Sequence, residues 1–280
     1  MKDIELVLAG IQKLPPMPQV VQRLSAMLQD PEVSANSLMA AVQLDQALTA
    51  NVLRVCNSAY YGSRRKITSL QQALTLMGNE RLLDIVMSQS SSVYFTTGNR
   101  GYDLARGELW RHSVAAALAS QILARRLTGR GDPMLYTAAL LHDIGKVVLS
   151  EFVAEGFEQI VALVREQGKS FEEAEREVVG IDHAELGGRI CERWDFPPQL
   201  VEAIRRHHRP QEAQADPLSS LVVVSDLICM LMGIGAGADG LAYHGGDAIM
   251  AKLRLTEADI HRTMAELAEE MQRADEMLRI

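Results

Sequence analysis

The feature that most limits how this chain can fold is its many helix start and stop signals, combined with the absence of convincing alternating strand patterns. Residues 68–71 and 170–173 both have capping-box spacing, and a Gly- and Pro-containing stretch at 129–133 is typical of a helix end. Apolar residues make up 48% of the chain and are mostly aliphatic or Met, whereas aromatic residues make up only 5%. That mixture favours helix over strand. The sequence therefore predicts an all-α fold.

The helical patterns also indicate how the chain is organised. Helices are expected over residues 34–43 and 45–56, and a further helix opens at 68–71 and ends at Gly78. The polar stretch 88–103 reads as the end of another helix followed by a linker. It divides the chain into an N-terminal helical part, residues 1–100, and a second packed helical subdomain, residues 101–280. That second subdomain begins with a helix over about 104–127.

Charge and cysteine usage exclude several classes of function. The formal net charge is -8, and a field of that sign repels nucleic-acid phosphates, so we expect no nucleic-acid partner. Cys56, Cys191 and Cys229 are far apart and form no CxxC pair, which argues against a disulfide framework and a zinc knuckle. A reducing, cytoplasmic location fits best.

One segment has nearly the composition of a membrane span. Residues 218–237 are almost all apolar, but Asp226 lies in the middle, and a carboxylate facing lipid would be costly. The N-terminus carries Asp3 and Glu5 within its apolar run, which a signal peptide would not. We therefore expect no membrane association and interpret 218–237 as a buried helix in which Asp226 has a functional role.

The histidines are distributed unevenly along the chain. Of seven, five fall in four helical contexts, at His112, at His142, at His183 and at the adjacent pair 207–208. Glu108 precedes His112 by four residues and shares its helix face. Imidazole and carboxylate ligands suit Zn, Mn or Fe, and a carboxylate such as Asp143 can bridge two ions that together clamp a phosphate.

The run at residues 142–146, HDIGK, with His112 upstream and Asp226 downstream, resembles the HD superfamily of metal-dependent phosphohydrolases. The first half resembles the HDOD family within it, through LPPMP at 14–18, NSAYYG at 57–62 and ITSLQQALTLMG at 67–78. The HDOD-like match runs from about residue 11 to 210. This resemblance implies an all-α fold, an HD-type helical bundle in the second subdomain and a role in bacterial signalling.

The candidate ligands are similar, in order, to those of the HD-GYP phosphodiesterases. The set is Glu108, His112, His142, Asp143, His183, His207, His208 and Asp226. The resemblance implies that they hold one or two divalent transition-metal ions (Fe, Mn or Zn) and that Asp143 and Lys146 take part in any catalysis. The sequence departs from the pattern after His183, where residues 184–189 read AELGGR and no Gly-Tyr-Pro signature follows. Residues 184–194 instead read as continuous helix.

Simpler interpretations of these residues stay open. His142 can be a core histidine at a capped helix end, and His207 and His208 can complement a helix C-terminus. A buried Arg or Ser would satisfy Asp226 as well as a metal would. His244 and His261 lie outside the pattern and are expected on the surface.

Two functions from different classes fit the sequence. One is a signalling module that binds metal and acts through signalling proteins or a small phosphorylated or nucleotide ligand. The alternative is a metal-dependent phosphohydrolase acting on a nucleotide or cyclic dinucleotide. The retained ligand set favours the enzyme, whereas the first half and the missing signature favour the module, which we prefer. The sequence leaves open whether any substrate is turned over.

Overall fold

The computed structural model describes residues 4–14, 21, 23–24, 27, 35–43, 45–58, 66–95, 100–235, 237 and 246–274. Within these ranges the regular elements are helices and no strand occurs, so the predicted all-α fold is confirmed. The helices are α1 Ile4–Lys13, α3 Ala35–Gln43, α4 Gln46–Cys56, α5 Leu70–Ser91, η1 Ser92–Phe95, η2 Arg100–Tyr102, α6 Glu108–Thr128, α7 Pro133–Leu141, α8 Ile144–Gln167, α9 Phe171–Val178, α10 His183–Arg193, α11 Pro198–Arg206, α12 Pro210–Ala213, α13 Pro217–Leu231, α14 Gly246–Leu253 and α15 Glu257–Arg273.

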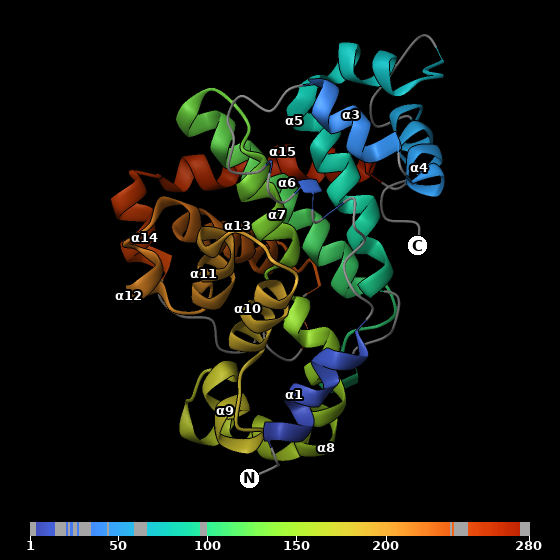
Figure 1. Cartoon of the computed structure of the whole chain (residues 1–280). Helices are drawn as coiled ribbons and strands as arrows, with labels where there is room; N and C mark the ends of the chain where they lie inside the picture. The colour runs from blue at the N-terminus through green and yellow to red at the C-terminus, as the bar shows by residue number, and fades with distance from the viewer. Residues whose placement is uncertain are drawn as a thin grey trace.

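Helices α3, α4 and α5 pack together at one end of the molecule, and α1, α8 and α9 lie at the other (Figure 1). The helices α6, α7, α10, α11 and α13 lie between them. Helix α6 packs against α7, α13 and α15, while α10 packs against α8 and α11. The aliphatic faces of these helices form a continuous buried core, as the helical pattern of the sequence requires.

The predicted helices of the first half need small corrections. The helices expected over 34–43 and 45–56 are present, the second capped by Asp45, whose side chain accepts from the backbone N–H of Leu48. At α5 the cap is Ser69, which accepts from the N–H of Gln72, so the capping motif starts one residue later than expected. Gly78, with φ 78°, breaks the helical path as predicted, so α5 consists of two helical segments that meet at this kink, the second of which runs to Ser91.

The stretch 88–103, expected to end a helix and then form a polar linker, contains further helical structure where it is described. Its described part includes the end of α5 and the two short 3-10 helices η1 and η2. Tyr94, Phe95 and Tyr102 in this stretch are buried, because its few aromatic side chains pack into the core. A buried hydrogen bond of 2.6 Å between the hydroxyls of Ser88 and Tyr136 also ties α5 to α7. The division of the chain near residue 100 stays a prediction.

Two boundaries in the second half follow from local chemistry. Helix α6 begins at Glu108 rather than near residue 104, because Gly107 adopts the left-handed conformation that interrupts a helix, with φ 85°. The apolar segment forms α13, capped by Asp216. Asp226 is buried within it, as expected. Among the described residues, no helix is both long and apolar enough to cross a membrane.

Candidate metal centre

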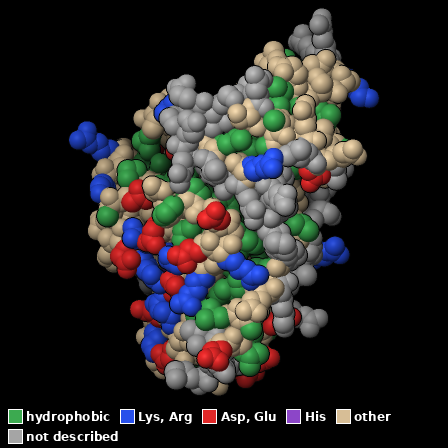
Figure 2. Space-filling view, viewed as in Figure 1, with side chains coloured by type: hydrophobic (Ala, Val, Ile, Leu, Met, Phe, Trp, Pro, Cys, Tyr) green, Lys and Arg blue, Asp and Glu red, His purple; other side chains and the backbone are tan. Residues whose placement is uncertain are grey.

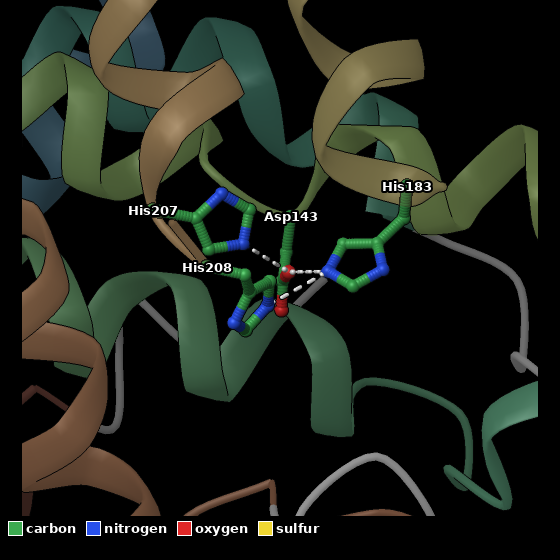
Figure 3. A group of neighbouring side chains, drawn as sticks. All are labelled: Asp143, His183, His207 and His208. Carbon is green, nitrogen blue, oxygen red and sulfur yellow. Dashed lines mark hydrogen bonds and ion pairs between the residues drawn. The ribbon is translucent and has the colours of Figure 1, made fainter. Parts of the chain in front are cut away.

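The candidate ligands come from helix ends and from two helices of the central layer. His142 and Asp143 form the tight junction between α7 and α8, where one helix stops and the next begins. His183 is the first residue of α10, whose start is fixed by Asp182 accepting from the N–H of Glu185 at 2.6 Å. His207 and His208 follow the last residue of α11. Figure 3 shows the side chains of His183, His207 and His208 converging on Asp143.

Glycines allow these elements to meet. A Cβ atom on Gly145 would lie 1.9 Å from the carbonyl oxygen of His183 and 2.8 Å from the backbone nitrogen of Gly187. A Cβ atom on Gly187 would in turn lie 3.1 Å from the side chain of Ile204. The N-terminal turn of α8 therefore touches the backbone of α10, and His183 is brought beside Asp143 for that reason.

Asp143 divides the centre into two halves. Its Oδ2 atom lies 3.4 Å from Nε2 of His142 and 3.6 Å from Nε2 of His112. Its Oδ1 atom lies 3.5 Å from Nε2 of His183 and 3.6 Å from Nε2 of His207. The two oxygens of one carboxylate thus face two separate pairs of imidazole nitrogens, which is the arrangement of a bridging ligand.

The remaining ligands extend the two halves. Asp226 joins the Oδ2 side, with its Oδ1 atom 3.1 Å from Nε2 of His112 and 3.6 Å from Nε2 of His142. His208 joins the Oδ1 side, with its Nε2 atom 2.9 Å from Nε2 of His183. We call the first group the Asp226 side and the second the His183 side. Asp143 is the residue that both groups share.

All five imidazole rings are held from behind through Nδ1. Backbone carbonyl oxygens accept from three of them: Ile234 from His112 at 2.8 Å, Ala139 from His142 at 2.7 Å and Ile204 from His207 at 2.6 Å. Carboxylates face the other two, Glu175 at 2.8 Å from His183 and Glu172 at 3.2 Å from His208. A carbonyl or carboxylate at Nδ1 keeps a proton on that nitrogen, so Nε2 is the ring atom that can bind a metal.

The residues present fit a divalent ion on each side of Asp143. Oδ1 of Asp143 and Nε2 of His207 are buried and have no hydrogen-bond partner. The Nε2 atoms of His112 and His142, whose Nδ1 atoms face carbonyls, lie 3.3 Å apart, so in neutral rings two lone pairs point at each other. Buried acceptors without a partner, such as Oδ1 of Asp143 and Nε2 of His207, are costly unless a cation or donor satisfies them.

Electrostatics keep the acids ionised. Burial acts to raise the pKa of Asp143, but the nearby His142 and Lys146 outweigh it and hold that pKa well below the usual range. Burial also acts to raise the pKa of Asp226, but hydrogen bonds from His112 and His142 outweigh it and hold that pKa well below the usual range. For His208, burial lowers the pKa well below its ordinary value, with further lowering by neighbouring histidines. A neutral imidazole and two carboxylates are the forms that bind metal.

Lys146 lies beside the centre. Its ammonium is buried and donates to Oδ2 of Asp143 at 2.6 Å. It also lies 5.4 Å from the ring centroid of Tyr102. The structure therefore brings together seven of the predicted ligands with the predicted Lys146, and it places Lys146 on Asp143 itself.

Glu108 is not brought into this group. Its side chain is exposed, and Oε2 accepts from the backbone N–H of Ala105 at 2.6 Å. The reason is its position in the first turn of α6, where the carboxylate satisfies a free backbone donor instead of following His112 inward. A spacing of four residues from His112 therefore does not direct Glu108 inward, because Glu108 is the first residue of α6. His261 is exposed as expected, and His244 lies outside the described residues.

The basic cluster near His207 is engaged with acids. Arg205 pairs with Glu192 at 2.7 Å and Arg206 with Glu202 at 2.7 Å. On the face drawn in Figure 2, blue and red side chains are interspersed in the lower half rather than separated. This agrees with a solvated, paired surface and not with a basic patch.

Three supporting residues were missed by sequence reasoning: Glu172, Glu175 and Tyr102. A signal was present in α9, where Phe171, Glu172, Ala174 and Glu175 are all buried. Acids that fall on the apolar face of a helix need a buried partner. The capping box at 170–173 drew attention to Glu173, which does cap the helix.

Comparison with known proteins agrees with this description. The family model of the HDOD domain matches residues 14–210. An HDOD domain protein of unknown function from Geobacter sulfurreducens has a similar structure, with 27% identity, a TM-score of 0.75, and coverage of 99% of this chain and 100% of that one. A candidate phosphohydrolase from Shewanella amazonensis shares the fold at 23% identity and a TM-score of 0.68, covering 97% and 96%.

Relatives by sequence are longer proteins. An uncharacterised protein of Treponema pallidum is 23% identical over 78% of this chain and 42% of its own length. A ribonuclease Y of Campylobacter curvus is 31% identical over 36% of this chain and 14% of its own length. The chain thus spans less than half of either relative. Because the family model covers well over half of the residues, the chain belongs to the HDOD family.

Proposed function

We propose that this HDOD protein is a cytoplasmic bacterial signalling module that binds two divalent transition-metal ions across Asp143. The observation that carries the proposal is the division of imidazole nitrogens between the two oxygens of one carboxylate. The ion on the Asp226 side would be held by His112, His142 and Asp226. The ion on the His183 side would be held by His183, His207 and His208. Fe, Mn and Zn all accept such nitrogen and oxygen ligands.

The charge of the centre indicates what kind of ligand it favours. Two divalent ions would bring four positive charges and the buried Lys146 a fifth, whereas Asp143, Asp226 and the outer acids Glu172 and Glu175 supply at most four negative charges. The excess positive charge favours an anion such as a phosphate group. We therefore propose that the module responds to a small phosphorylated or nucleotide ligand, or to a signalling protein that presents one.

Burial supports a module over an open enzyme. The side chains of His112, His142, Asp143, His183 and His207 are at most 2% exposed, and that of His208 is 10% exposed. Helix α10 also continues unbroken from His183 to Arg193 in the segment that follows the ligand. A large substrate needs access to its reacting phosphorus and accurate placement there.

The second candidate function is a metal-dependent phosphohydrolase, which the contact between Lys146 and Asp143 favours. Ions bound here would supply Lewis-acid activation of a phosphate ester. Lys146 would contribute fixed positive charge beside the carboxylate that both ions share. Both candidates require the same ligands, so turnover separates them.

Binding of inorganic phosphate to Mn-loaded protein, measured by calorimetry, tests the proposal. We expect saturable binding that is lost in Asp143→Ala. The matched control is Asp259→Ala, which removes the capping acid of α15, outside the candidate centre, and should leave phosphate binding unchanged. Metal-loaded protein that shows no phosphate binding would refute the anion-responsive part of the proposal.

A further inference from the structure

A buried hydrogen-bonded chain reaches the His183 side of the centre from outside the ligand set. The hydroxyl of Tyr102 donates to Oε1 of Glu175 at 2.5 Å. Oε2 of Glu175 accepts both from Nδ1 of His183, at 2.8 Å, and from the backbone N–H of His183, at 3.0 Å. All three residues are fully buried. Glu175 is thus held by donors on both of its oxygens, and in turn it fixes both the ring and the backbone of His183.

The outer end of this series of hydrogen bonds lies at Tyr102, in a segment that packs tightly on α8. Tyr102 ends η2, and a Cβ atom on the neighbouring Gly101 would lie 2.3 Å from the carbonyl oxygen of Ser150. The N–H of Gly101 also donates to the hydroxyl of Ser150 at 3.3 Å. The segment Arg100–Tyr102 therefore has little freedom to shift along α8 while this contact exists. Its position determines where the Tyr102 hydroxyl lies.

Helix α9 presents two carboxylates to the same side of the centre. Glu172 and Glu175 are three residues apart, on one helix face, and contact His208 and His183 respectively. The rings of the Asp226 side are held by backbone carbonyls instead. On the His183 side, the main chain holds only His207, through the carbonyl of Ile204. The rings of His183 and His208 are held there by side chains that a movement of η2 or α9 can displace.

We propose that Tyr102 and Glu175 are positioning residues that couple the docking of η2 on α8 to metal binding at the His183 side. The inference rests on the proposed two-ion centre. Displacement of η2 would withdraw the Tyr102 hydroxyl, free Glu175 to move and release His183 from its binding orientation. The Asp226 side would keep its ion. A signal that displaces η2, in the segment joining the two parts of the chain, would then change the metal occupancy of the His183 side.

Two substitutions in the full-length protein test this coupling. Tyr102→Phe removes the hydroxyl but keeps the ring contacts with Phe171 and His183, at centroid distances of 5.7 and 6.0 Å. Glu175→Gln keeps the shape but removes the charge. Outer partners of metal-bound histidines typically change metal affinity by about 10- to 100-fold. We expect the affinity for the second Mn²⁺ ion to weaken by about tenfold in each variant, with the first ion retained.

The controls remove comparable groups elsewhere. Tyr136→Phe also loses a buried tyrosine hydroxyl, one that contacts Ser88 instead of Glu175. Glu173→Gln alters the capping acid of the same helix α9. Both should bind two ions as the wild type does. The second readout is the ¹⁵N signal of the His183 ring in metal-free and Zn-loaded protein, which reports whether Nδ1 keeps its proton and partner regardless of activity.

The outcomes separate this inference from the proposed function. Selective loss of one ion in Tyr102→Phe and Glu175→Gln, with an altered His183 ring signal, supports the coupling. Wild-type affinities for both ions in both variants would overturn it and leave the two-ion centre standing. If the wild type binds no ion, the proposed centre fails, and the metal-free ring signal decides the positioning role: a signal unchanged in Tyr102→Phe overturns it, and a changed one supports it.

Discussion

Gly145 and His183 are in backbone contact: a Cβ atom added to Gly145 would lie 1.9 Å from the carbonyl oxygen of His183. Gly145 lies two residues after Asp143, and His183 opens α10. The bridge and its partner histidine are therefore adjacent only because α8 carries no side chain at this crossing.

Gly145→Ala should separate the two helices and destabilise the fold. Alanine improves helix propensity by about 1 kcal/mol, but a contact with backbone atoms cannot be relieved by a rotamer change and costs about 3 kcal/mol. We expect a net loss of about 2 kcal/mol in the free energy of unfolding, measured by denaturant titration of metal-free protein. Gly156→Ala, on the same helix, meets only the side chain of Val178 and should change stability by less than about 1 kcal/mol. Equal effects of the two substitutions would contradict this explanation.

Asp143→Ala should remove metal more completely than His208→Ala. Asp143 contacts both sides of the centre, whereas His208 belongs to the His183 side. We expect Asp143→Ala to retain less than a tenth of the wild-type metal and His208→Ala to retain about half, as a bridging and a one-sided ligand should. Elemental analysis after reconstitution measures this, with circular dichroism as the check for folding. Similar retention in the two variants would show that Asp143 is not a bridge.

Metal affinity should rise with pH between 7 and 9. Burial alone would lower the pKa of His183, but the adjacent Glu175 raises it to about 9. In metal-free protein at pH 7 this ring is therefore protonated on both nitrogens, and an ion at Nε2 must displace a proton. Calorimetry with Mn²⁺ at pH 7, in buffers of different ionisation enthalpy, should detect about one released proton from this residue. An affinity that is flat between pH 7 and 9 would contradict the assignment.

The raised pKa of His183 gives the stability of the metal-free protein the opposite pH dependence to that of metal binding. A histidine whose pKa is raised in the folded state stabilises that state fully below its unfolded pKa, near 6.5, and the contribution is lost as pH rises through about 9. The metal-free protein should lose this stabilisation over the pH range in which metal binding strengthens. Thermal unfolding with and without Mn²⁺ across this range measures both trends.

Cyclic di-GMP should not be turned over at a physiological rate, even by metal-loaded protein. The candidate ligands are buried, and α10 continues as helix after His183, where no Gly-Tyr-Pro signature stands. Misplacing the reacting phosphorus by about 1 Å can cost about a hundredfold in rate. Steady-state assays with Fe, Mn and Mg, using Asp143→Ala as the blank, should show less than about 0.1 turnovers per second, against about 10 for a typical enzyme. Faster turnover would favour the phosphohydrolase over the module.

The elements that the sequence predicts correctly are those in which residue chemistry and helical periodicity indicate the same structure. The buried helix around Asp226 was predicted because a carboxylate in an apolar run needs a partner, and the structure places that partner at His112. The helix at 184–194 was predicted from its apolar face and is present as α10. Both depend on local patterns that a single sequence displays.

The parts that could not be predicted depend on contacts between distant segments. Glu108 has the right spacing from His112, but its position at a helix start directs it to a backbone donor. Tyr102 and Glu175 meet across 73 residues of sequence, and no local pattern pairs them. The role of Gly145 is likewise visible only once α8 and α10 cross.

If Asp143 bridges two ions, the metal content of the purified protein should depend on this one residue. Protein reconstituted anaerobically with Fe²⁺ or Mn²⁺ and freed of excess metal is measured by elemental analysis, alongside Asp143→Ala and the control Asp259→Ala, which alters the cap of α15. The account predicts about two ions per chain in the wild type and in Asp259→Ala, and almost none in Asp143→Ala. A wild-type stoichiometry below about a tenth of an ion per chain, or equal metal in all three proteins, would contradict it.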